Sequence, residues 1–162
     1  MRSNTLKFVA GSLAMLWLQI FFFYADVPLL FFHLLSGSPL ARGTVTSGYG
    51  LRIAPVRGGL EFHDGVDLAA PQGAAIAAVA DGTVLEVGCG SGYGNYIVIR
   101  HQCNVKSLYA HCSVIFAKEG DSVRRGETIA AVGSTGNSTG SHLHLHVEYR
   151  GRTISPRKAV RY

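Results

Sequence analysis

The chain has 162 residues, which suits one domain of ordinary size, and with 48% apolar and 15% charged residues it is more apolar than a typical soluble protein. Its net charge of +5 and pI near 9.3 come from scattered Lys and Arg rather than from a run. This pattern argues against a nucleic-acid-binding protein.

The apolar excess is concentrated near the amino terminus. Residues 8–25 contain no charged side chain, and as a helix they would be about 27 Å long, close to the hydrocarbon thickness of a bilayer. Arg2 and Lys7 precede this run, so the positive-inside rule predicts a cytoplasmic amino terminus and an outward-facing remainder. We therefore expect residues 1–35 to form a single-pass membrane anchor.

A cleaved signal peptide is the alternative, because it too begins with basic residues and an apolar run. However, residues 23–25 (FYA) put a bulky side chain where the cleavage site needs a small one, and a second apolar stretch, residues 27–35, follows at once. We favour the uncleaved anchor. Pro28 is expected to end or kink its helix.

Residues 36–43 are expected to form a short linker, and residues 44–162 a folded domain. Short β-rich runs separated by glycine-rich turns follow, with no long amphipathic helix. This pattern predicts an all-β fold, a small antiparallel sheet domain of sandwich or barrel-like form. The expected strands are residues 75–80, 83–87, 96–101, 106–111, 128–132 and 142–149.

The chain has an odd number of cysteines, Cys89, Cys103 and Cys112, so at most one intramolecular disulfide can form. Cys103 and Cys112 flank an expected hairpin, so a disulfide between them is plausible, but the sequence does not establish it. No CxxC pair is present, so a cysteine zinc site is not predicted.

Residues 141–148 (SHLHLHVE) place His142, His144 and His146 at alternate positions, with an apolar residue after each. Side chains of a strand alternate between its faces, so the histidines share one face and the apolar residues pack into the core. Neutral imidazole is the commonest metal ligand. The strand therefore indicates a metal site, with zinc as the first candidate.

A second cluster, residues 62–68 (FHDGVDL), holds His63 and Asp67 on either side of a glycine. In an extended chain their α-carbons would lie about 13 Å apart, so joint ligation requires a turn at Asp64-Gly65. His63, Asp67 and one histidine of residues 142–146 would then form a three-ligand site with an open position for water, as in catalytic zinc sites. Taken singly, each residue could instead make an ordinary polar contact.

Further motifs lie before and between these two clusters, and the last one runs into residues 141–148: TSGYGLR (46–52), Gly73 followed by ADGTV (80–84), YGN (93–95), YAH (109–111), GDSV (120–123) and GSTGNSTGSHLH (133–144). In this order they resemble the lysostaphin-type zinc metallo-endopeptidases, which cut the peptide part of bacterial cell walls. The resemblance covers nearly all of residues 44–156. It implies a small antiparallel β domain with a groove over the metal.

The resemblance places zinc ligands at His63, Asp67 and His144, with one Zn²⁺ per domain, and two non-ligand catalytic histidines at His111 and His142. Zinc would polarise the scissile carbonyl and activate a water. Either catalytic histidine could take the proton while the other stabilises the oxyanion, and the sequence does not apportion these roles.

Two further residues, Arg52 and Asn95, are substrate-groove candidates by the same resemblance, although structural roles would also account for them. The chain departs from the family at His146, where a glutamate is frequent. A rival register would make His144 catalytic and His146 a ligand. We reject it because Gly140 and Ser141 directly precede His142, so His146 is expected to line the groove or support a ligand.

These features predict a zinc endopeptidase that hydrolyses cross-links or stem peptides of peptidoglycan, anchored in the bacterial inner membrane with its domain on the periplasmic or cell-wall side. Secretion after signal cleavage is the alternative location. A catalytically weak or inactive peptidoglycan-binding module that activates other wall hydrolases is the alternative function. A phosphohistidine carrier is a third, but it has no use for Asp67. The sequence does not indicate which peptide bond is cut, nor the oligomeric state.

Overall fold

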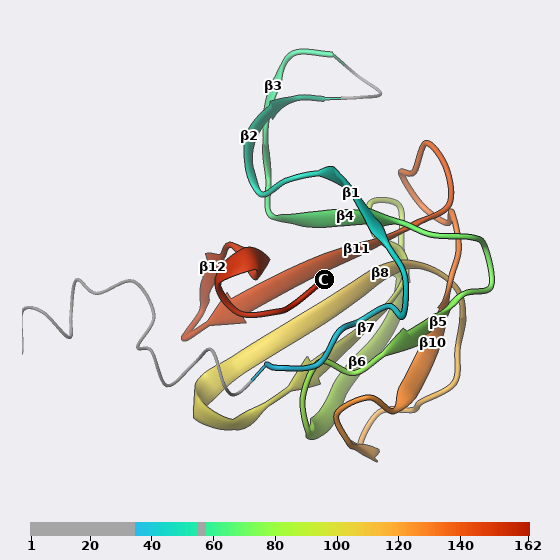
Figure 1. Cartoon of the computed structure of the whole chain (residues 1–162), viewed down its shortest axis with the longest axis vertical. Helices are drawn as coiled ribbons and strands as arrows, with labels where there is room; N and C mark the ends of the chain where they lie inside the picture. Colours follow the sequence, from blue (N-terminus) through green and yellow to red (C-terminus); the bar gives the residue numbers. More distant parts are fainter. Residues whose placement is uncertain (1–34, 55–57) are drawn as a thin grey trace, which may run out of the picture. The chain divides into compact units, whose positions relative to one another are not determined.

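Strand β11 (His142–Tyr149) lies between β4 (Gly65–Ala69) and β8 (Val105–Ile115) in the computed structural model, which describes residues 35–54 and 58–162 (Figure 1). All strand pairs of this described part are antiparallel. The other elements are β1 (Thr44–Ser47), β2 (Gly50–Ile53), β3 (Leu60–His63), β5 (Ala75–Ala77), β6 (Gly82–Gly90), β7 (Gly94–Arg100), β9 (Ser122–Val123), β10 (Thr128–Val132), β12 (Arg152–Ile154) and the 3₁₀ turns η1 (Gln102–Asn104) and η2 (Pro156–Lys158).

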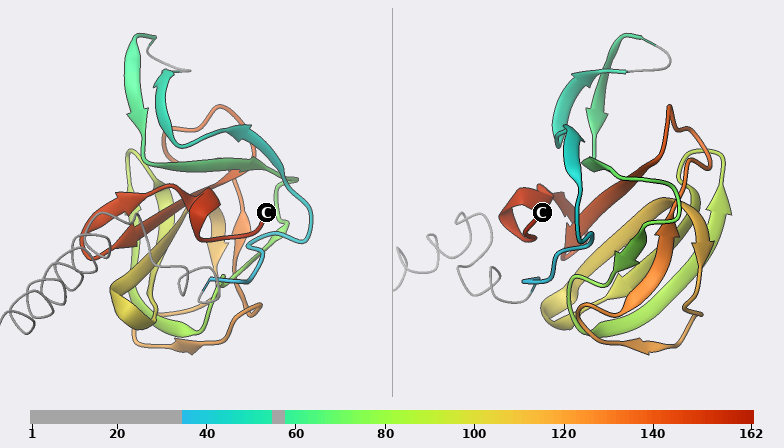
Figure 2. Two further views of the ribbon diagram at one scale, coloured as in Figure 1. Left: turned by 60° about the vertical axis from the view of Figure 1, so that its left-hand side comes forward. Right: turned by 45° about the vertical axis from the view of Figure 1, so that its right-hand side comes forward.

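Within the described residues the strands form one ten-stranded sheet in the order β1-β4-β11-β8-β7-β6-β9. Strand β12 pairs with β11, and β10 connects β8 to β5. Strands β2 and β3 form a separate hairpin, which stands away from the remaining strands in Figure 2. The predicted all-β antiparallel fold is confirmed.

The expected strands correspond to β5, β6, β7, β8, β10 and β11, although β5 ends at Ala77 and β8 continues to Ile115. Strands β1 to β4, β9 and β12 were not predicted. They are only two to five residues long. Such short runs carry too few alternating positions to be distinguished from loops, and pairing with neighbours is what makes them strands.

Residues 36–43, the expected linker, lie against the domain. Leu40 is buried, the Gly37 N–H donates to the Val79 carbonyl at 2.9 Å, and the Ala77 N–H donates to the Pro39 carbonyl at 2.9 Å. This segment therefore adds backbone hydrogen bonds and apolar contacts to the fold.

Of the predicted membrane anchor, residues 1–35, all but Leu35 lie outside the described residues, and so does its whole uncharged run, residues 8–25. From residue 35 onward, leaving out residues 55–57, the structure contains no helix that is long and apolar enough to cross a bilayer.

The core is built on the alternation of β11. Leu143, Leu145 and Val147 are fully buried, together with Tyr109 on β8 and Ile97 on β7. Each such side chain contributes about 1.5–3 kcal/mol through removal of apolar surface from water. The opposite face of β11 carries its three histidines, as expected from the strand period.

All three cysteines are free thiols, so the Cys103–Cys112 disulfide that the sequence left open does not form. The two residues do not flank a hairpin, because β8 is a single strand that begins after Cys103 and contains Cys112. From Val105 to Cys112 this strand rises about 23 Å, far beyond the span of a disulfide. Cys112 is buried, and burial raises the pKa of its thiol to about 12.

His101 belongs to a buried polar chain away from the histidine face. Its Nδ1–H donates to the Asp81 carbonyl at 2.8 Å, and its Nε2 lies 2.7 Å from the Ser107 hydroxyl. The Ser107 hydroxyl lies 3.0 Å from that of Tyr109, which also accepts the Val79 N–H at 3.0 Å. Burial lowers the pKa of His101 below its ordinary value of 6.5.

Replacing Leu145 by alanine tests the core. We expect Leu145→Ala to lower the free energy of unfolding by about 2–5 kcal/mol, because it leaves a cavity at a fully buried position. The same change at Leu51, which is 71% exposed, should cost less than about 0.5 kcal/mol. Urea unfolding of the full chain with chelator present measures both, and equal losses would contradict the assignment of the core.

Acidification tests His101. The pKa of His101 is lowered in the folded state, so on acidification this histidine is protonated in the unfolded chain before it is protonated in the folded one. The free energy of unfolding therefore falls as the pH drops below 6.5. His101→Asn has no group that titrates in this range. We expect the wild type to lose more unfolding free energy than His101→Asn between about pH 7.5 and about pH 5. Parallel stability curves would contradict this.

Candidate metal centre

One residue separates β3 from β4, and this break brings two predicted ligands together. His63 is the last residue of β3 and Gly65 the first of β4, so the chain bends at Asp64, where the sequence predicted a turn. Strand β4 pairs with β11 in the register that sets Asp67 directly opposite His144. Three ligand candidates from distant parts of the sequence thereby meet.

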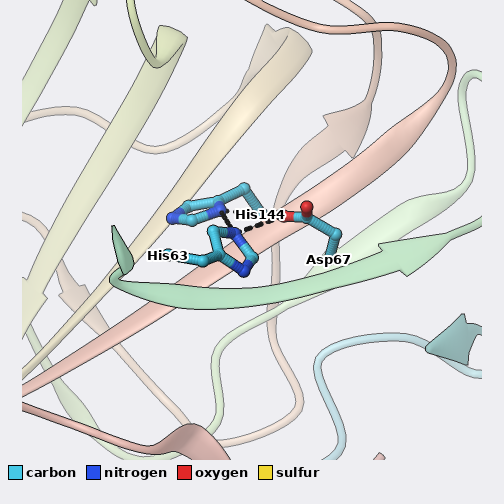
Figure 3. A group of neighbouring side chains, drawn as sticks. All are labelled: His63, Asp67 and His144. Atoms are coloured by element: carbon cyan, nitrogen blue, oxygen red, sulfur yellow. Dashed lines mark hydrogen bonds and ion pairs between the residues drawn. The ribbon is translucent and has the colours of Figure 1, made fainter. Parts of the chain in front are cut away.

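The three side chains direct one atom each toward a common point (Figure 3). His63 Nε2 lies 3.1 Å from Asp67 Oδ1 and 3.1 Å from His144 Nδ1, and the last two atoms are 2.9 Å apart. All three residues are buried. In a tetrahedral zinc site with bonds of about 2.0–2.1 Å, neighbouring ligand atoms lie about 3.3 Å apart, so the observed triangle is close to that size.

The chemistry of these atoms also fits a metal ion. The Nδ1–H of His63 donates to the Gly48 carbonyl at 2.8 Å, so Nε2 of the neutral ring carries a lone pair. This lone pair faces an aspartate oxygen and a second imidazole nitrogen. Three acceptors this close in a buried site need a shared proton or a cation between them, and two nitrogens with one carboxylate oxygen form a suitable donor set for zinc.

The electrostatics agree with a site that collects positive charge. Burial alone would raise the pKa of Asp67, but hydrogen bonds and charge from His144 and His63 hold it well below its usual range. Burial alone would lower the pKa of His144, yet its contacts with Asp64 and Asp67 raise it. The carboxylates thus favour a positive group at His144.

Arg52 holds the second carboxylate oxygen of Asp67. Its Nη1 donates to Asp67 Oδ2 at 2.9 Å and to the Ser47 hydroxyl at 2.6 Å, and its Nε donates to Glu61 at 2.7 Å. Strands β2 and β3 place Arg52 and Glu61 opposite each other. The arginine therefore orients Asp67 so that Oδ1 faces the two histidines, and it also lines the groove.

The two predicted catalytic histidines lie beside the triad with matching orientations. The Nδ1–H of His111 donates to the Thr135 carbonyl at 2.8 Å, and that of His142 donates to the Gly140 carbonyl at 2.8 Å. Their ring centroids are 4.7 Å apart. With Nδ1 committed to the backbone, each neutral ring presents Nε2 as a proton acceptor. Burial lowers the pKa of His111, and the hydrogen bond to Thr135 offsets this effect only in part. The resulting pKa is about 4.

A β-bulge aims His111 at the site. Tyr109 pairs with Ile97 and Cys112 pairs with Asn95. Between these two pairs β8 therefore contains one residue more than β7. His111 takes up the extra residue with φ of +62°, in the left-handed region. Such a conformation costs about 1–3 kcal/mol and is typical of functional sites, where a bulge redirects one side chain.

A groove of about 370 Å³ covers the triad and both further histidines. A second hollow of about 470 Å³ shares Arg52, Asp67, Thr139 and His142 with it, so the groove continues past Asp67 into this second hollow. Asn95 is not among the lining residues of either hollow. Its amide Nδ2 donates to the Cys112 carbonyl at 3.1 Å, and its backbone N–H donates to the Thr135 hydroxyl at 2.9 Å.

His146 is not part of the three-residue group that the described residues form. Its Nε2 lies 3.2 Å from the Thr153 hydroxyl and its Nδ1 lies 3.8 Å from Asp64 Oδ2. His144, two residues earlier, belongs to that group instead. This geometry supports the register chosen from the sequence over its rival.

Two residues near the triad were not predicted to be functional. Asp64 Oδ1 lies 3.2 Å from Nε2 of His144, and the Tyr93 hydroxyl donates to Asp64 Oδ2 at 2.5 Å. Burial alone would raise the pKa of Asp64, but contacts with His144 and Tyr93 bring it well below its usual range. In the sequence Asp64 had only the signal of a turn residue beside glycine.

Gly65 is required by the packing of the His144 ring. A Cβ atom at this position would lie 2.7 Å from Nε2 of His144 and 2.5 Å from the Leu145 carbonyl oxygen. Both distances are far inside van der Waals contact. The glycine therefore allows β4 to approach β11 closely enough for His63 and Asp67 to reach His144.

Comparison with known proteins identifies the family. The model of Peptidase family M23 matches residues 61–156, more than half of the chain. The chain belongs to peptidase family M23. The predicted resemblance to the lysostaphin-type enzymes is confirmed.

The M23 chain is similar to several curated proteins over part of their length. It is 44% identical to the DD-carboxypeptidase/endopeptidase Mpg of Neisseria meningitidis over 118 residues, covering 73% of this chain and 27% of that protein. It is 41% identical to the peptidoglycan DD-endopeptidase ShyB of Vibrio cholerae over 116 residues, covering 71% and 27%. It is also 41% identical to the murein hydrolase activator NlpD of Escherichia coli over 95 residues, covering 58% and 25%. The chain thus spans about a quarter of the length of these relatives.

Solved structures show the same fold. A zinc-containing peptidase from Vibrio cholerae superposes with a TM-score of 0.68 and 38% identity, covering 75% of this chain and 38% of that one. The catalytic domain of the prophage-encoded M23 protein EnpA from Enterococcus faecalis gives 0.67 and 35%, covering 76% and 95%. The catalytic domain of lysostaphin from Staphylococcus simulans gives 0.65 and 30%, covering 72% and 90%.

Removing one imidazole at a time tests the metal centre. We expect His144→Ala to weaken zinc binding by more than about 100-fold, because it deletes a donor of the triangle, whereas His146→Ala should change it by less than about 3-fold. Competition with a chromophoric chelator measures both affinities on the full chain. The reverse pattern would restore the rival register with His146 as the ligand.

Proposed function

We propose that this protein is a zinc-dependent endopeptidase that hydrolyses peptide cross-links or stem peptides of bacterial peptidoglycan. The observation that carries the proposal is the convergence of His63, Asp67 and His144 in a groove that also holds His111 and His142. The names of two relatives, the peptidoglycan DD-endopeptidase ShyB and the DD-carboxypeptidase/endopeptidase Mpg, support this substrate class.

The reaction needs a metal ion, a proton acceptor and a group that stabilises the developing oxyanion. When held by His63, Asp67 and His144, one zinc ion would supply Lewis acidity for the scissile carbonyl and acidify a water molecule. His111 and His142 can each accept a proton at Nε2, or donate from it once protonated. One of them acts as the base and the other stabilises the oxyanion.

The groove and its walls position the peptide. Two hollows meet at Arg52, Asp67 and His142, which suits an extended peptide that runs from one hollow into the other past the triad. Backbone carbonyls hold both catalytic rings in one orientation, so little reorganisation is needed when the substrate enters.

The murein hydrolase activator NlpD is also a relative, which makes activation of another wall hydrolase the second candidate function. A module that only binds a partner or the wall has no need of three facing donor atoms and two oriented histidines beside them. The complete set favours hydrolysis, and the two functions give different outcomes in one assay.

We further propose that the domain acts on the outer side of the bacterial inner membrane. The support is the uncharged run of residues 8–25, preceded by Arg2 and Lys7, which predicts an anchor with an outward-facing remainder. Release after signal cleavage is the alternative, and the mass of the mature protein in a membrane fraction distinguishes them.

The enzymatic proposal predicts cleavage of purified sacculi by the full chain alone. We expect soluble muropeptides with new amino termini, loss of this activity with chelator and its return with zinc. His142→Ala should slow release by about 10²–10⁴-fold, because it removes a proton-transfer group, while the remote His101→Asn should retain activity. Mass spectrometry of the products measures the rates and identifies the bond cut. If sacculi are degraded only after another hydrolase is added, the chain is an activator instead.

A further inference from the structure

The ring of His144 is buried between two carboxylates, and only one of them belongs to the triad. Among the buried side-chain nitrogen and oxygen atoms of the described residues, two have no hydrogen-bond partner, Nε2 of His144 and Nδ1 of His146. Asp64 is close to both: Oδ1 lies 3.2 Å from the first and Oδ2 lies 3.8 Å from the second. The feature that needs an explanation is therefore this second carboxylate.

The tautomer of His144 follows from the triad. Its Nδ1 faces His63 Nε2 and Asp67 Oδ1 at 3.1 Å and 2.9 Å, the side on which a metal ion would be held. A neutral ring that offers a lone pair at Nδ1 carries its proton on Nε2. That N–H requires an acceptor in a buried site, and Asp64 Oδ1 at ion-pair distance is the carboxylate oxygen beside it.

Asp64 is itself held in place. The Tyr93 hydroxyl donates to Oδ2 at 2.5 Å, which leaves Oδ1 to face His144. The Tyr93 ring also lies against the His144 ring, with centroids 5.6 Å apart and planes 33° apart. The break between β3 and β4 at this residue fixes the backbone from which the carboxylate projects.

We propose that Asp64, fixed by Tyr93, is a positioning residue of the metal centre that accepts the Nε2 proton of His144 and so orients Nδ1 and increases its basicity. A carboxylate behind a ligating imidazole has this effect on metal sites in general. His63 makes the corresponding contact with a neutral carbonyl, that of Gly48, so the two histidines would differ in donor strength. The inference rests on the proposed metal site of His63, Asp67 and His144.

Zinc affinity of the full chain tests the proposal. We expect Asp64→Asn to bind zinc about 10–100-fold more weakly than wild type, and Tyr93→Phe to be weakened in the same direction, since each removes part of this support. Asp64→Glu keeps the charge but displaces the carboxylate, and we expect it to be weakened by at least about 10-fold. Asp121→Asn, which removes an exposed carboxylate bound to the Lys118 N–H, is the matched control and should bind like wild type.

Two affinity results would overturn the proposal. If Asp64→Asn and Tyr93→Phe both bind zinc as tightly as wild type, Asp64 does not support the site. If Asp64→Glu binds like wild type while Asp64→Asn is weak, only the negative charge matters and positioning is wrong. Because Tyr93→Phe leaves the carboxylate in place, it keeps the test decisive should Asp64→Asn fail to fold.

A spectroscopic readout separates positioning from a loss of structure. In the Co²⁺-substituted chain, the ring N–H protons of His63 and His144 should give two shifted, exchangeable NMR signals. Asp64→Asn should move the His144 signal or speed its exchange, while the His63 signal, protected by the Gly48 carbonyl, should stay unchanged. Two unchanged signals would refute the role of Asp64. Failure of the wild-type chain to bind any zinc would instead overturn the metal site itself.

Discussion

The pairing of β4 with β11 is the constraint on which the site depends. It sets Asp67 opposite His144 and Gly65 opposite His146. The missing side chain of Gly65 leaves room for the ring of His144. A slip of one residue would turn the histidine face of β11 into the core, because strand side chains alternate. Burial of Leu143, Leu145 and Val147 on the other face opposes that slip, so core packing holds the candidate metal ligands in register.

Each of the three ligand candidates has a different kind of group beside its far end. A carbonyl of Gly48 contacts His63, the guanidinium of Arg52 contacts Asp67, and the carboxylate of Asp64 faces His144. These contacts leave one atom of each side chain facing the common point. Pre-orientation of this kind reduces the conformational entropy lost when an ion is bound. It gives a role to the polar contacts that Arg52 of β2 makes with Glu61 of β3 and with Asp67.

The two predicted catalytic histidines, His111 and His142, depend on backbone geometry rather than on side-chain partners. Their Nδ1 atoms donate to carbonyls of the loop before β11, those of Thr135 and Gly140, and His111 reaches its place through a bulge with positive φ. Loop, bulge and sheet must therefore be intact together for both Nε2 atoms to face the groove. A conformation that is unfavourable by itself is retained here because the strands on both sides hold it.

The sequence by itself determined that residues 142–149 form a strand with one histidine face, because a side-chain period of two is a local property, and its motifs were sufficient to indicate the family and the lysostaphin-like fold. It also indicated a turn at Asp64-Gly65. Only the tertiary structure decided that Asp67 faces His144 and that His111 lies on a bulge. It also decided that the Asn95 amide donates to the Cys112 carbonyl and that Asp64 lies beside Nε2 of His144. Each of these depends on register or contact between strands distant in the chain, and no local pattern of residues specifies which partner a strand will pair with.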